Sequence, residues 1–482
     1  MNLLLRGGVV LTGPDWVPTP LDVQVAEGRI AALGAPGTLA GEATLDVTDR
    51  LIMPGLVNGH THSHTLPVRG VLRQATLEDS LLGAAWMAGP RPAELSELSA
   101  IIAATEMVAS GATGAFDLLG QTGGPEPEGL WAAARGYASV GLRTVIAPMV
   151  ADRSVHEAVP VIGECCGVPV SGLDAEEIVA RTRTYVEGFP ALAGVGPAVA
   201  PTIPAHCSAE LIWGLQSLAV EHGLRIHLHL AESKVQALAG EERFGHPIVS
   251  ELARLGVLSP RLTAAHGIWL SAESRDALAG AGVVVVTVPG SNLRLGSGVA
   301  DVRGLLRAGV RIGIGTDGAN SADLLDMLDA VRLTSLMSRA FVQPAADWLS
   351  VEETLTAATE GGAAACGWDD VGRIQAGYRA DLTFLDLRAR AFLPANDLAN
   401  QVLTAARSGD VTDVMVGGRF VYQDRTFPGL DLAAIEGRFR TLAEQWRATV
   451  AGGVATGRTQ VGEARAALAA ERAREWEPRH LL

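Results

Sequence analysis

Short apolar runs alternate with alanine-rich segments of helical periodicity between residues 51 and 370. Eight of these runs have the length and composition of buried strands, and most are followed by a helical pattern. They lie at Ile52–His64, Gly114–Leu118, Arg143–Val150, Gly196–Ala200, Arg225–Leu230, Leu262–Ala265, Val283–Val288 and Arg311–Gly315. Eight strand–helix units favour an α/β fold of the (β/α)8 TIM-barrel type over an open doubly wound sheet. No Gly-x-Gly-x-x-Gly motif follows the first strand, which argues against a dinucleotide-binding fold.

Both ends of the chain have a different sequence pattern, in which strand-like runs are closely spaced and bounded by glycine and aspartate. Residues 1–50 contain four such runs. A turn flanked by strands at 371–386 and a hairpin pattern at 411–422 follow the barrel region. We expect the two regions to pair, so that one small sheet domain is built from both ends of the chain.

The length, composition and net charge of the chain argue against several classes of function. The chain has 482 residues, of which 48% are hydrophobic and 19% charged, as expected for a large globular enzyme. A net charge of −15 acts against binding to nucleic acid or to an anionic membrane. No run approaches the roughly 20 apolar residues of a membrane span, and the first residues lack a signal peptide's apolar core. We therefore expect a cytoplasmic protein that acts on a small molecule.

The four cysteines form no CxxC pair, so neither a disulfide framework nor a thiolate zinc site is indicated.

Two histidines, His60 and His62, end the first predicted barrel strand. Residues i and i+2 of a strand point to the same face, so both imidazoles reach one point in space. Two neutral imidazoles at one point are the ligands that a transition metal such as Zn²⁺ prefers. A buried pair of core histidines is the alternative, and the pattern alone leaves both open.

Further metal-type residues lie at the ends of other predicted strands. His229 ends its strand and Glu232 follows just beyond it. His266 ends the next strand, and Asp317 ends the last one. Because the active site of a (β/α)8 barrel lies at the carboxyl ends of its strands, we expect these side chains to converge. Metal-type residues at four strand ends would be improbable in a purely structural barrel.

The expected metal ligands are His60, His62, His229 and Asp317. Asp317 can also take a proton from metal-bound water, whose pKa the metal lowers from about 15.7 towards ~7. We expect His266 to hydrogen-bond this water or to polarise the group attacked. Glu232 is placed to pass a proton to a ring nitrogen or to the leaving group. Such a site suits hydrolysis at an sp² carbon bonded to nitrogen, with ammonia or an amine departing.

These motifs resemble the amidohydrolase superfamily. The resemblance rests on Pro54–His62, His229-x-x-Glu232, His266 and Thr316-Asp317-Gly318. The segment Pro289–Gly298 is similar to the Pro-x-Ser-Asn-x-(Lys/Arg)-Leu-x-Ser-Gly signature of the aminohydrolase and chlorohydrolase branch. That branch includes triazine hydrolases and deaminases of guanine, pterins and S-adenosylhomocysteine. The resemblance covers nearly the whole chain apart from about its last fifty residues.

The resemblance also implies a domain organisation. It predicts a composite β-sandwich from residues 1–50 and 371–429, a metal-dependent hydrolase barrel at 51–370 and a helical tail at 430–482. The tail is amphipathic and rich in Arg and Glu, so we expect it to be solvated or to pack against another subunit. Enzymes of this kind are commonly dimers or tetramers, and we expect a homo-oligomer.

The single lysine of the chain, Lys234, bears on the number of metals. Binuclear members of the superfamily bridge two metals with a carboxylated lysine on the fourth strand. Lys234 follows the strand that ends in His229, so no lysine is available at the bridging position. A mononuclear site is the better interpretation, with Zn²⁺ expected and Fe²⁺ compatible with the same ligands.

The predicted function is hydrolytic deamination of an N-heteroaromatic compound of the purine, pterin or triazine type, by attack of metal-bound hydroxide. The alternative is hydrolysis of an amide, urea or carbamate bond, as in phenylurea hydrolases. A catalytically silent scaffold is disfavoured because every expected ligand is present. Two departures argue against simple transfer of an adenosine or S-adenosylhomocysteine deaminase label. Thr287 stands where relatives often have His, and Pro201–Pro204 replaces a Pro-His-x-Pro segment.

Four residues are candidate substrate contacts: His64, Trp86, His206 and Asn320. His64 continues the i, i+2 series beyond the metal pair, and Trp86 could stack on a flat ring. His206 follows an apparent strand end, displaced from the position that nucleoside deaminases use. Asn320 lies close to Asp317 in the sequence. His227 shares a face with His229 but is deeper in its strand, so we expect it to fill the barrel interior.

Overall fold

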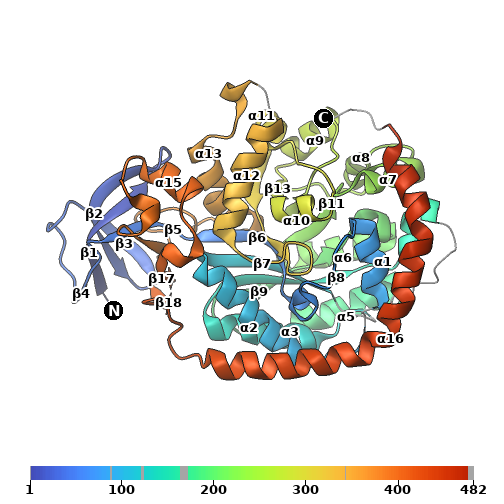
Figure 1. Ribbon diagram of the computed structural model, residues 1–482, viewed down its shortest axis with the longest axis horizontal. Coiled ribbons are helices and arrows are strands. Elements are labelled where there is room, and N and C mark those ends of the chain that lie inside the picture. The colour runs from blue at the N-terminus through green and yellow to red at the C-terminus, as the bar shows by residue number, and fades with distance from the viewer. Residues whose placement is uncertain (1, 87–88, 121–123, 163–171, 342–343, 476–482) are drawn as a thin grey trace.

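The computed structural model describes residues 2–86, 89–120, 124–162, 172–341 and 344–475 (Figure 1). It is an α/β structure whose strands form three hydrogen-bonded sheets. Two of them are built mainly from parallel strands that alternate with helices, and the third contains strands from both ends of the chain. No helix in these described ranges is long and apolar enough to cross a membrane.

The parallel strands carry the predicted site. The first parallel sheet has the order β10-β8-β7-β6-β15, with β9 paired to β8, and the second has the order β11-β12-β13-β14. Their bounds are β6 Leu56–His62, β7 Ala112–Gly120, β8 Arg143–Val150, β9 Val195–Pro197, β10 Ala200–Pro201, β11 Ile226–Leu230, β12 Leu262–His266, β13 Val284–Thr287, β14 Arg311–Ile314 and β15 Asp317–Gly318.

Backbone contacts join these sheets at both edges. A parallel bridge pairs Val199 with Ile226, and the amide of Thr316 donates to the carbonyl of His60 at 3.2 Å. The single strand predicted at Gly196–Ala200 is instead two short strands, β9 and β10. The gap lies opposite Ala147 and Pro148 of β8, and Pro148 lacks the N–H group that continuous ladder pairing requires. The expectation of one closed (β/α)8 barrel stays a prediction.

Helices follow most of these strands and begin where the sequence provides a cap. The side chains of Ser208, Ser233 and Ser271 each accept a backbone N–H from the first turn of the helix that follows. The helices are α1 Leu77–Trp86, α2 Ala93–Ala109, α3 Pro127–Val140, α4 Val155–Ala158, α5 Ala175–Glu187, α6 Ala209–His222, α7 Lys234–Phe244, α8 Ile248–Arg254, α9 Ala272–Gly280, α10 Pro289–Arg294, α11 Val302–Ala308, α12 Met327–Phe341, α13 Val351–Thr356, α14 Gly362–Cys366, α15 Leu398–Thr404 and α16 Leu432–Ala473.

The third sheet has eight strands in the order β18-β17-β16-β5-β1-β2-β3, with β4 paired to β1 (left in Figure 1). Its strands are β1 Asn2–Thr12, β2 Val17–Ala26, β3 Arg29–Gly34, β4 Ala43–Asp46, β5 Arg50–Pro54, β16 Leu382–Asp386, β17 Val411–Val416 and β18 Arg419–Tyr422. β16 pairs with β5, and β5 pairs with β1, so strands from both ends of the chain share one sheet, as predicted; β5 itself includes Ile52–Pro54, which the sequence assigned to the first barrel strand. The domain boundaries themselves stay predictions.

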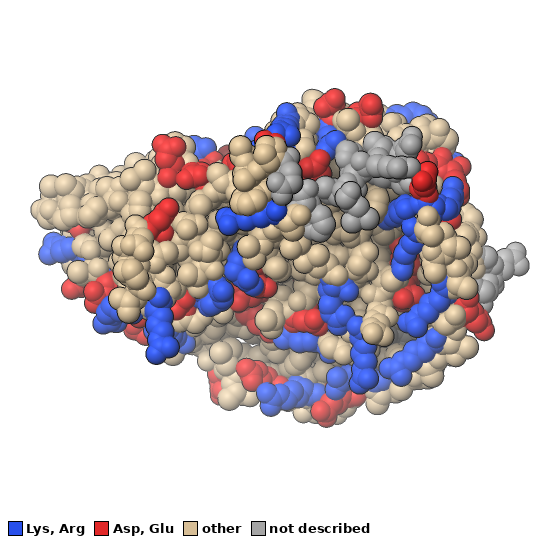
Figure 2. All heavy atoms as spheres, turned by 45° about the horizontal axis from the view of Figure 1, so that its top comes forward, with Lys and Arg blue, Asp and Glu red and all other residues tan. Residues whose placement is uncertain are grey.

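The long helix α16 packs along the molecule (Figure 1). Its buried hydrophobic residues include Leu442, Ala443, Trp446, Val450, Ala464 and Leu468. The expectation of a solvated or subunit-packing tail is therefore incomplete, because this apolar stripe covers α1 and α2 of the same chain. On the surface, basic and acidic side chains are interspersed over the face shown in Figure 2.

Candidate active site

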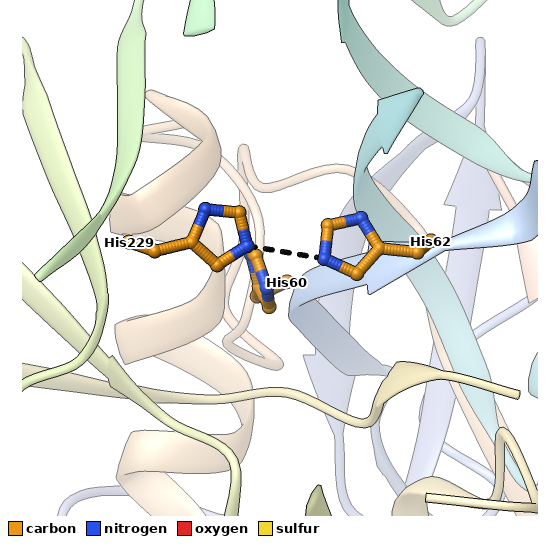
Figure 3. A group of neighbouring side chains, drawn as sticks. All are labelled: His60, His62 and His229. Carbon is orange, nitrogen blue, oxygen red and sulfur yellow. Dashed lines mark hydrogen bonds between the residues drawn. The ribbon is translucent and has the colours of Figure 1, made fainter. Parts of the chain in front are cut away.

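The four predicted metal ligands converge at the ends of neighbouring strands. His60 and His62 lie at the end of β6, His229 near the end of β11 and Asp317 at the start of β15, which pairs with β6. Figure 3 shows the three imidazoles turned toward one another. The Nε2 atom of His62 is 3.2 Å from Nε2 of His229 and 3.2 Å from Oδ1 of Asp317. Nε2 of His60 is 3.7 Å from the same Asp317 oxygen. All four side chains are buried.

Backbone carbonyls fix the orientation of two of these rings. Nδ1 of His62 lies 2.7 Å from the carbonyl oxygen of Leu118, and Nδ1 of His229 lies 2.7 Å from that of Thr202. A carbonyl only accepts, so each Nδ1 carries the proton and each neutral ring presents a lone pair at Nε2. Two such lone pairs face each other at 3.2 Å, an arrangement that a shared cation stabilises. Among the described residues, the buried Nε2 of His60 has no hydrogen-bond partner. The donor set therefore fits a divalent metal.

The electrostatics of the cluster also favour a positive charge at this point. Burial alone would lower the pKa of His62, but the hydrogen bond and charge of Asp317 outweigh it and raise this pKa. Burial would raise the pKa of Asp317, yet His62 and His266 hold it well below its usual range. Burial and the neighbouring histidines lower the pKa of His229 to about 3. Asp317 is therefore ionised and His229 neutral, which are their metal-binding forms, and the field that favours a proton on His62 also favours a metal ion.

Three residues around the site have left-handed backbone conformations that non-glycine residues rarely adopt. They are Ala231 (φ 45°), His266 (φ 71°) and Asp317 (φ 64°). For Asp317 the conformation is held by hydrogen bonds, because its Oδ1 accepts the N–H of Gly318 at 2.7 Å and its carbonyl accepts the Thr61 hydroxyl at 3.1 Å. Such strain occurs at functional sites, where the surrounding structure holds side chains in place.

Glu232 and His266 form a second pair beside the predicted ligands. Oε2 of Glu232 is 3.4 Å from Nε2 of His266. Nδ1 of His266 lies 2.9 Å from Oδ1 of Asn292, so the side-chain amide oxygen accepts from Nδ1 and leaves Nε2 facing Glu232. Burial, followed by the negative charges of Asp317 and Glu78, raises the pKa of Glu232 well above its usual value. A raised pKa favours the protonated carboxyl, which is the form that can donate a proton to a substrate.

The predicted substrate contacts are placed less uniformly. The His64 ring lies 5.5 Å from that of His62, and its Nδ1 accepts the N–H of Gly120 at 3.3 Å. His206 is buried, which lowers its pKa to about 4, and no described contact joins its side chain to the metal cluster. Asn320 is partly buried and follows Asp317 closely. Trp86 ends α1, and its side chain lies outside the described residues. These four assignments stay predictions.

His227 lies deeper in the interior than His229, as expected from its earlier position in β11. Its Nε2 atom is 3.1 Å from Nδ1 of His60, and its ring packs edge-on against Phe116. It therefore contacts His60 from below the cluster and fills the interior.

Sequence reasoning missed the residues that support the predicted ligands. Asp117 on β7 accepts hydrogen bonds from the Ser63 amide at 3.0 Å, the Ser63 hydroxyl at 2.5 Å and the Tyr137 hydroxyl at 2.8 Å. Ser63 directly follows His62, so Asp117 fixes the chain just beyond this histidine. The available signal was a single acidic residue inside an otherwise apolar strand.

Asn58 plays a similar part on the other side of the site. Its side-chain nitrogen donates to Oγ1 of Thr316 at 2.7 Å, and its oxygen accepts the Thr316 amide at 3.1 Å. Thr316 directly precedes Asp317. The strand that carries both histidines is therefore tied to the residue next to Asp317.

The chain is similar to known proteins over most of its length. Residues 51–421 match the model of the amidohydrolase family. The chain is 30% identical over 450 residues to 5-methylthioadenosine/S-adenosylhomocysteine deaminase of Pyrococcus furiosus, covering 92% of this chain and 100% of the relative. It is 32% identical over 446 residues to the enzyme of the same name from Haloarcula marismortui, covering 91% and 96%.

Solved structures give the same result. A zinc-bound adenosine deaminase from Xanthomonas campestris matches with a TM-score of 0.81 and 28% identity, covering 92% of this chain and 98% of that one. A zinc complex of atrazine chlorohydrolase from Arthrobacter aurescens matches with a TM-score of 0.83 over 92% and 100% of the two chains, and at 23% identity it supports the fold alone. The chain belongs to the amidohydrolase family and is a hydrolase that acts on carbon–nitrogen bonds.

Proposed function

We propose that this amidohydrolase deaminates an N-heteroaromatic ring that carries an exocyclic amino group, with adenine-type compounds as the first candidates. The observation that carries the proposal is the buried Glu232 carboxyl, whose pKa is raised and which lies 3.4 Å from His266, beside the cluster of predicted metal ligands. A proton donor at this place suits a ring nitrogen, which gains basic character as water adds to the neighbouring carbon.

The proposed ligands of a single Zn²⁺ are His60, His62, His229 and Asp317. The zinc-bound adenosine deaminase relative supports zinc, and Fe²⁺ fits the same donors. Lys234 supports a mononuclear site, because its Nζ donates to the carbonyl of Arg472 at 3.0 Å and is held at the start of α7. When bound, the metal lowers the pKa of a coordinated water towards ~7 and so supplies the nucleophile.

The side chains around the metal cluster account for the proton transfers. Asp317 is ionised and can accept the proton that the attacking water loses. Glu232 gives its proton to the ring nitrogen, while Asn292 orients His266 so that its Nε2 faces Glu232. Transfer of the proton held by Asp317 to the amino group then releases ammonia, and the remaining hydroxyl proton returns to Glu232 as the ring carbonyl forms. Addition of one water and loss of one ammonia balance the reaction.

We also propose that the two parallel sheets form one closed (β/α)8 barrel, with the domain bounds predicted from the sequence. The Val199–Ile226 bridge and the hydrogen bond from Thr316 to His60 support closure at the two edges. Closure would place all the proposed ligands at one end of one barrel.

The substrate class is proposed from the relatives, several of which are deaminases of methylthioadenosine and S-adenosylhomocysteine. Thr287 and the Pro201–Pro204 segment depart from the pattern of nucleoside deaminases. The proposal therefore rests more on recognition of the adenine ring than on recognition of the ribose. A smaller aminopurine, a pterin or an aminotriazine offers the same ring chemistry.

An ammonia-release assay tests the proposal. Zinc-reconstituted protein is incubated with S-adenosylhomocysteine, methylthioadenosine, adenosine, an aminopterin, melamine and a phenylurea, with Glu232→Gln as the matched inactive control. Ammonia from at least one aminated heterocycle, absent with the control, is expected. Release of aniline from the phenylurea alone would support the urea hydrolase alternative, and no product from any compound would overturn the proposal.

A further inference from the structure

The last turns of α16 meet the start of α7, directly beyond Glu232. The carbonyl of Arg472 accepts from Nζ of Lys234 at 3.0 Å, and Arg474 pairs with Glu242 of α7. Figure 1 shows this end of α16 beside α1 and α7, and both helices contact it. The only lysine of the chain therefore caps the C-terminal end of the long helix, where a cation is favoured.

A buried carboxylate lies at the centre of this junction. Glu78, in the first turn of α1, is 1% exposed. Its Oε2 accepts from the Arg472 guanidinium at 2.5 Å, and its Oε1 accepts the hydroxyl of Ser233. A buried carboxylate requires a cation and hydrogen-bond donors, and Arg472 and Ser233 are the described partners that supply them.

Ser233 connects Glu78 to the backbone of Glu232 through the side chain of Gln236. Its Oγ accepts the N–H of Gln236 at 3.1 Å, and Oε1 of Gln236 accepts the N–H of Glu232 at 3.1 Å. The preceding residue, Ala231, has the left-handed φ of 45°. Because local geometry disfavours that turn, the chain at Glu232 needs contacts from elsewhere to stay in place.

Apolar packing fixes the same part of α16. Ala464 and Leu468 belong to one buried cluster with Leu82 of α1 and Val235 of α7. Within the same stretch, Arg465 lies 3.7 Å from Asp79 of α1, next to Glu78 but without a link to Ser233. The helix is thus held in register independently of Arg472, and Arg465 offers a matched ion pair for comparison.

We propose that Arg472 is a positioning residue for Glu232. Through Glu78 and Ser233 it holds the turn between β11 and α7, so that the Glu232 carboxyl stays 3.4 Å from His266. The C-terminal helix then contributes to proton transfer without touching substrate. The inference rests on the proposed role of Glu232 as the proton donor.

The test compares Arg472→Met with Arg472→Lys and with Arg465→Met as the control, all in the zinc-loaded full chain. Loss of a charge-assisted hydrogen bond predicts hydrogen–deuterium exchange about tenfold faster at amides 232–237 in Arg472→Met. Its kcat falls by about the same factor, with KM and zinc content unchanged. Arg472→Lys restores part of both, and Arg465→Met behaves as the wild type.

The outcomes separate this inference from the proposed function. Wild-type exchange and kcat in Arg472→Met, or an equal loss in Arg465→Met, would overturn it. If the wild type deaminates none of the compounds, the proposed function fails while the exchange rates still decide the positioning role. Should Arg472→Met not fold, Glu78→Gln removes the same ion pair without leaving a buried unpaired charge. Unchanged exchange at 232–237 in that variant would equally overturn the inference.

Discussion

The Nε2 atoms of His62 and His229 face one another at 3.2 Å, while the Nδ1 atom of each ring lies 2.7 Å from a backbone carbonyl. The carbonyls fix both neutral rings in one tautomer, so neither ring has a proton to share with the other. A positive charge between the two rings stabilises this contact. The charge is either a proton on His62, beside Asp317, or a metal ion. This relationship underlies the first prediction.

His229→Ala is expected to lose both bound zinc and turnover, because it removes one of the facing nitrogens. Elemental analysis after reconstitution and dialysis measures the metal. The control is His222→Ala, which alters the exposed group formed by His222, Glu187 and Glu221. Zinc retained by His229→Ala and lost from His222→Ala would place the metal on the surface instead.

Glu232→Gln is expected to keep its zinc and lose turnover by about 10²- to 10⁴-fold, the usual contribution of a general acid. The glutamine occupies the same space but has no proton to give. Zinc content and ammonia release are measured on the same preparation. Loss of zinc in this variant would show that Glu232 is a ligand and not a proton donor.

The stability of the metal-free protein should depend on pH through Glu232. Burial raises the pKa of this carboxyl well above its usual value of 4.5, so the folded chain keeps a proton that the unfolded chain loses. This stabilisation is fully present below about pH 4.5 and is lost as pH rises through the folded-state pKa. Relative to Glu232→Gln, the wild type should therefore become less stable to urea as the pH rises above about 4.5. A difference between the two that is constant with pH contradicts the assignment.

Asp117→Asn is expected to destabilise the fold by about 2 kcal/mol, since hydrogen bonds to a charged acceptor contribute roughly 1.5–3 kcal/mol. Asp117 holds Ser63, so the variant should also weaken zinc binding at His62. Tyr137→Phe removes one donor to the same carboxylate and should cost about 1 kcal/mol with little effect on zinc. Urea unfolding and zinc titration measure both quantities, and equal zinc affinity in Asp117→Asn and the wild type would argue against this support.

The parts of the site and fold that depend on residues close together in the sequence were largely predictable. His60 and His62 share a face because strand side chains alternate with a period of two, and the structure brings them together with His229 and Asp317. The predicted hairpin also matches β17 and β18, because two glycines separate two short apolar runs. Each of these features follows from residues a few positions apart.

The supporting contacts were not predictable, because they join residues far apart in the chain. Asp117 reaches Ser63, and Arg472 reaches Glu78, across segments whose packing the charge pattern does not encode. The left-handed φ of Asp317 likewise depends on hydrogen bonds from Thr61 and Gly318 that form only in the folded protein. An amphipathic pattern in α16 predicted a helix and left its partner open.

The most direct test of the account is a titration of the metal-free protein with zinc, followed by ammonia release from an adenine-type substrate. A single site predicts activity that rises linearly and reaches its plateau at one zinc per chain. A plateau at two zinc ions per chain, or ammonia release that does not depend on added metal, would contradict the mononuclear metal-dependent deaminase.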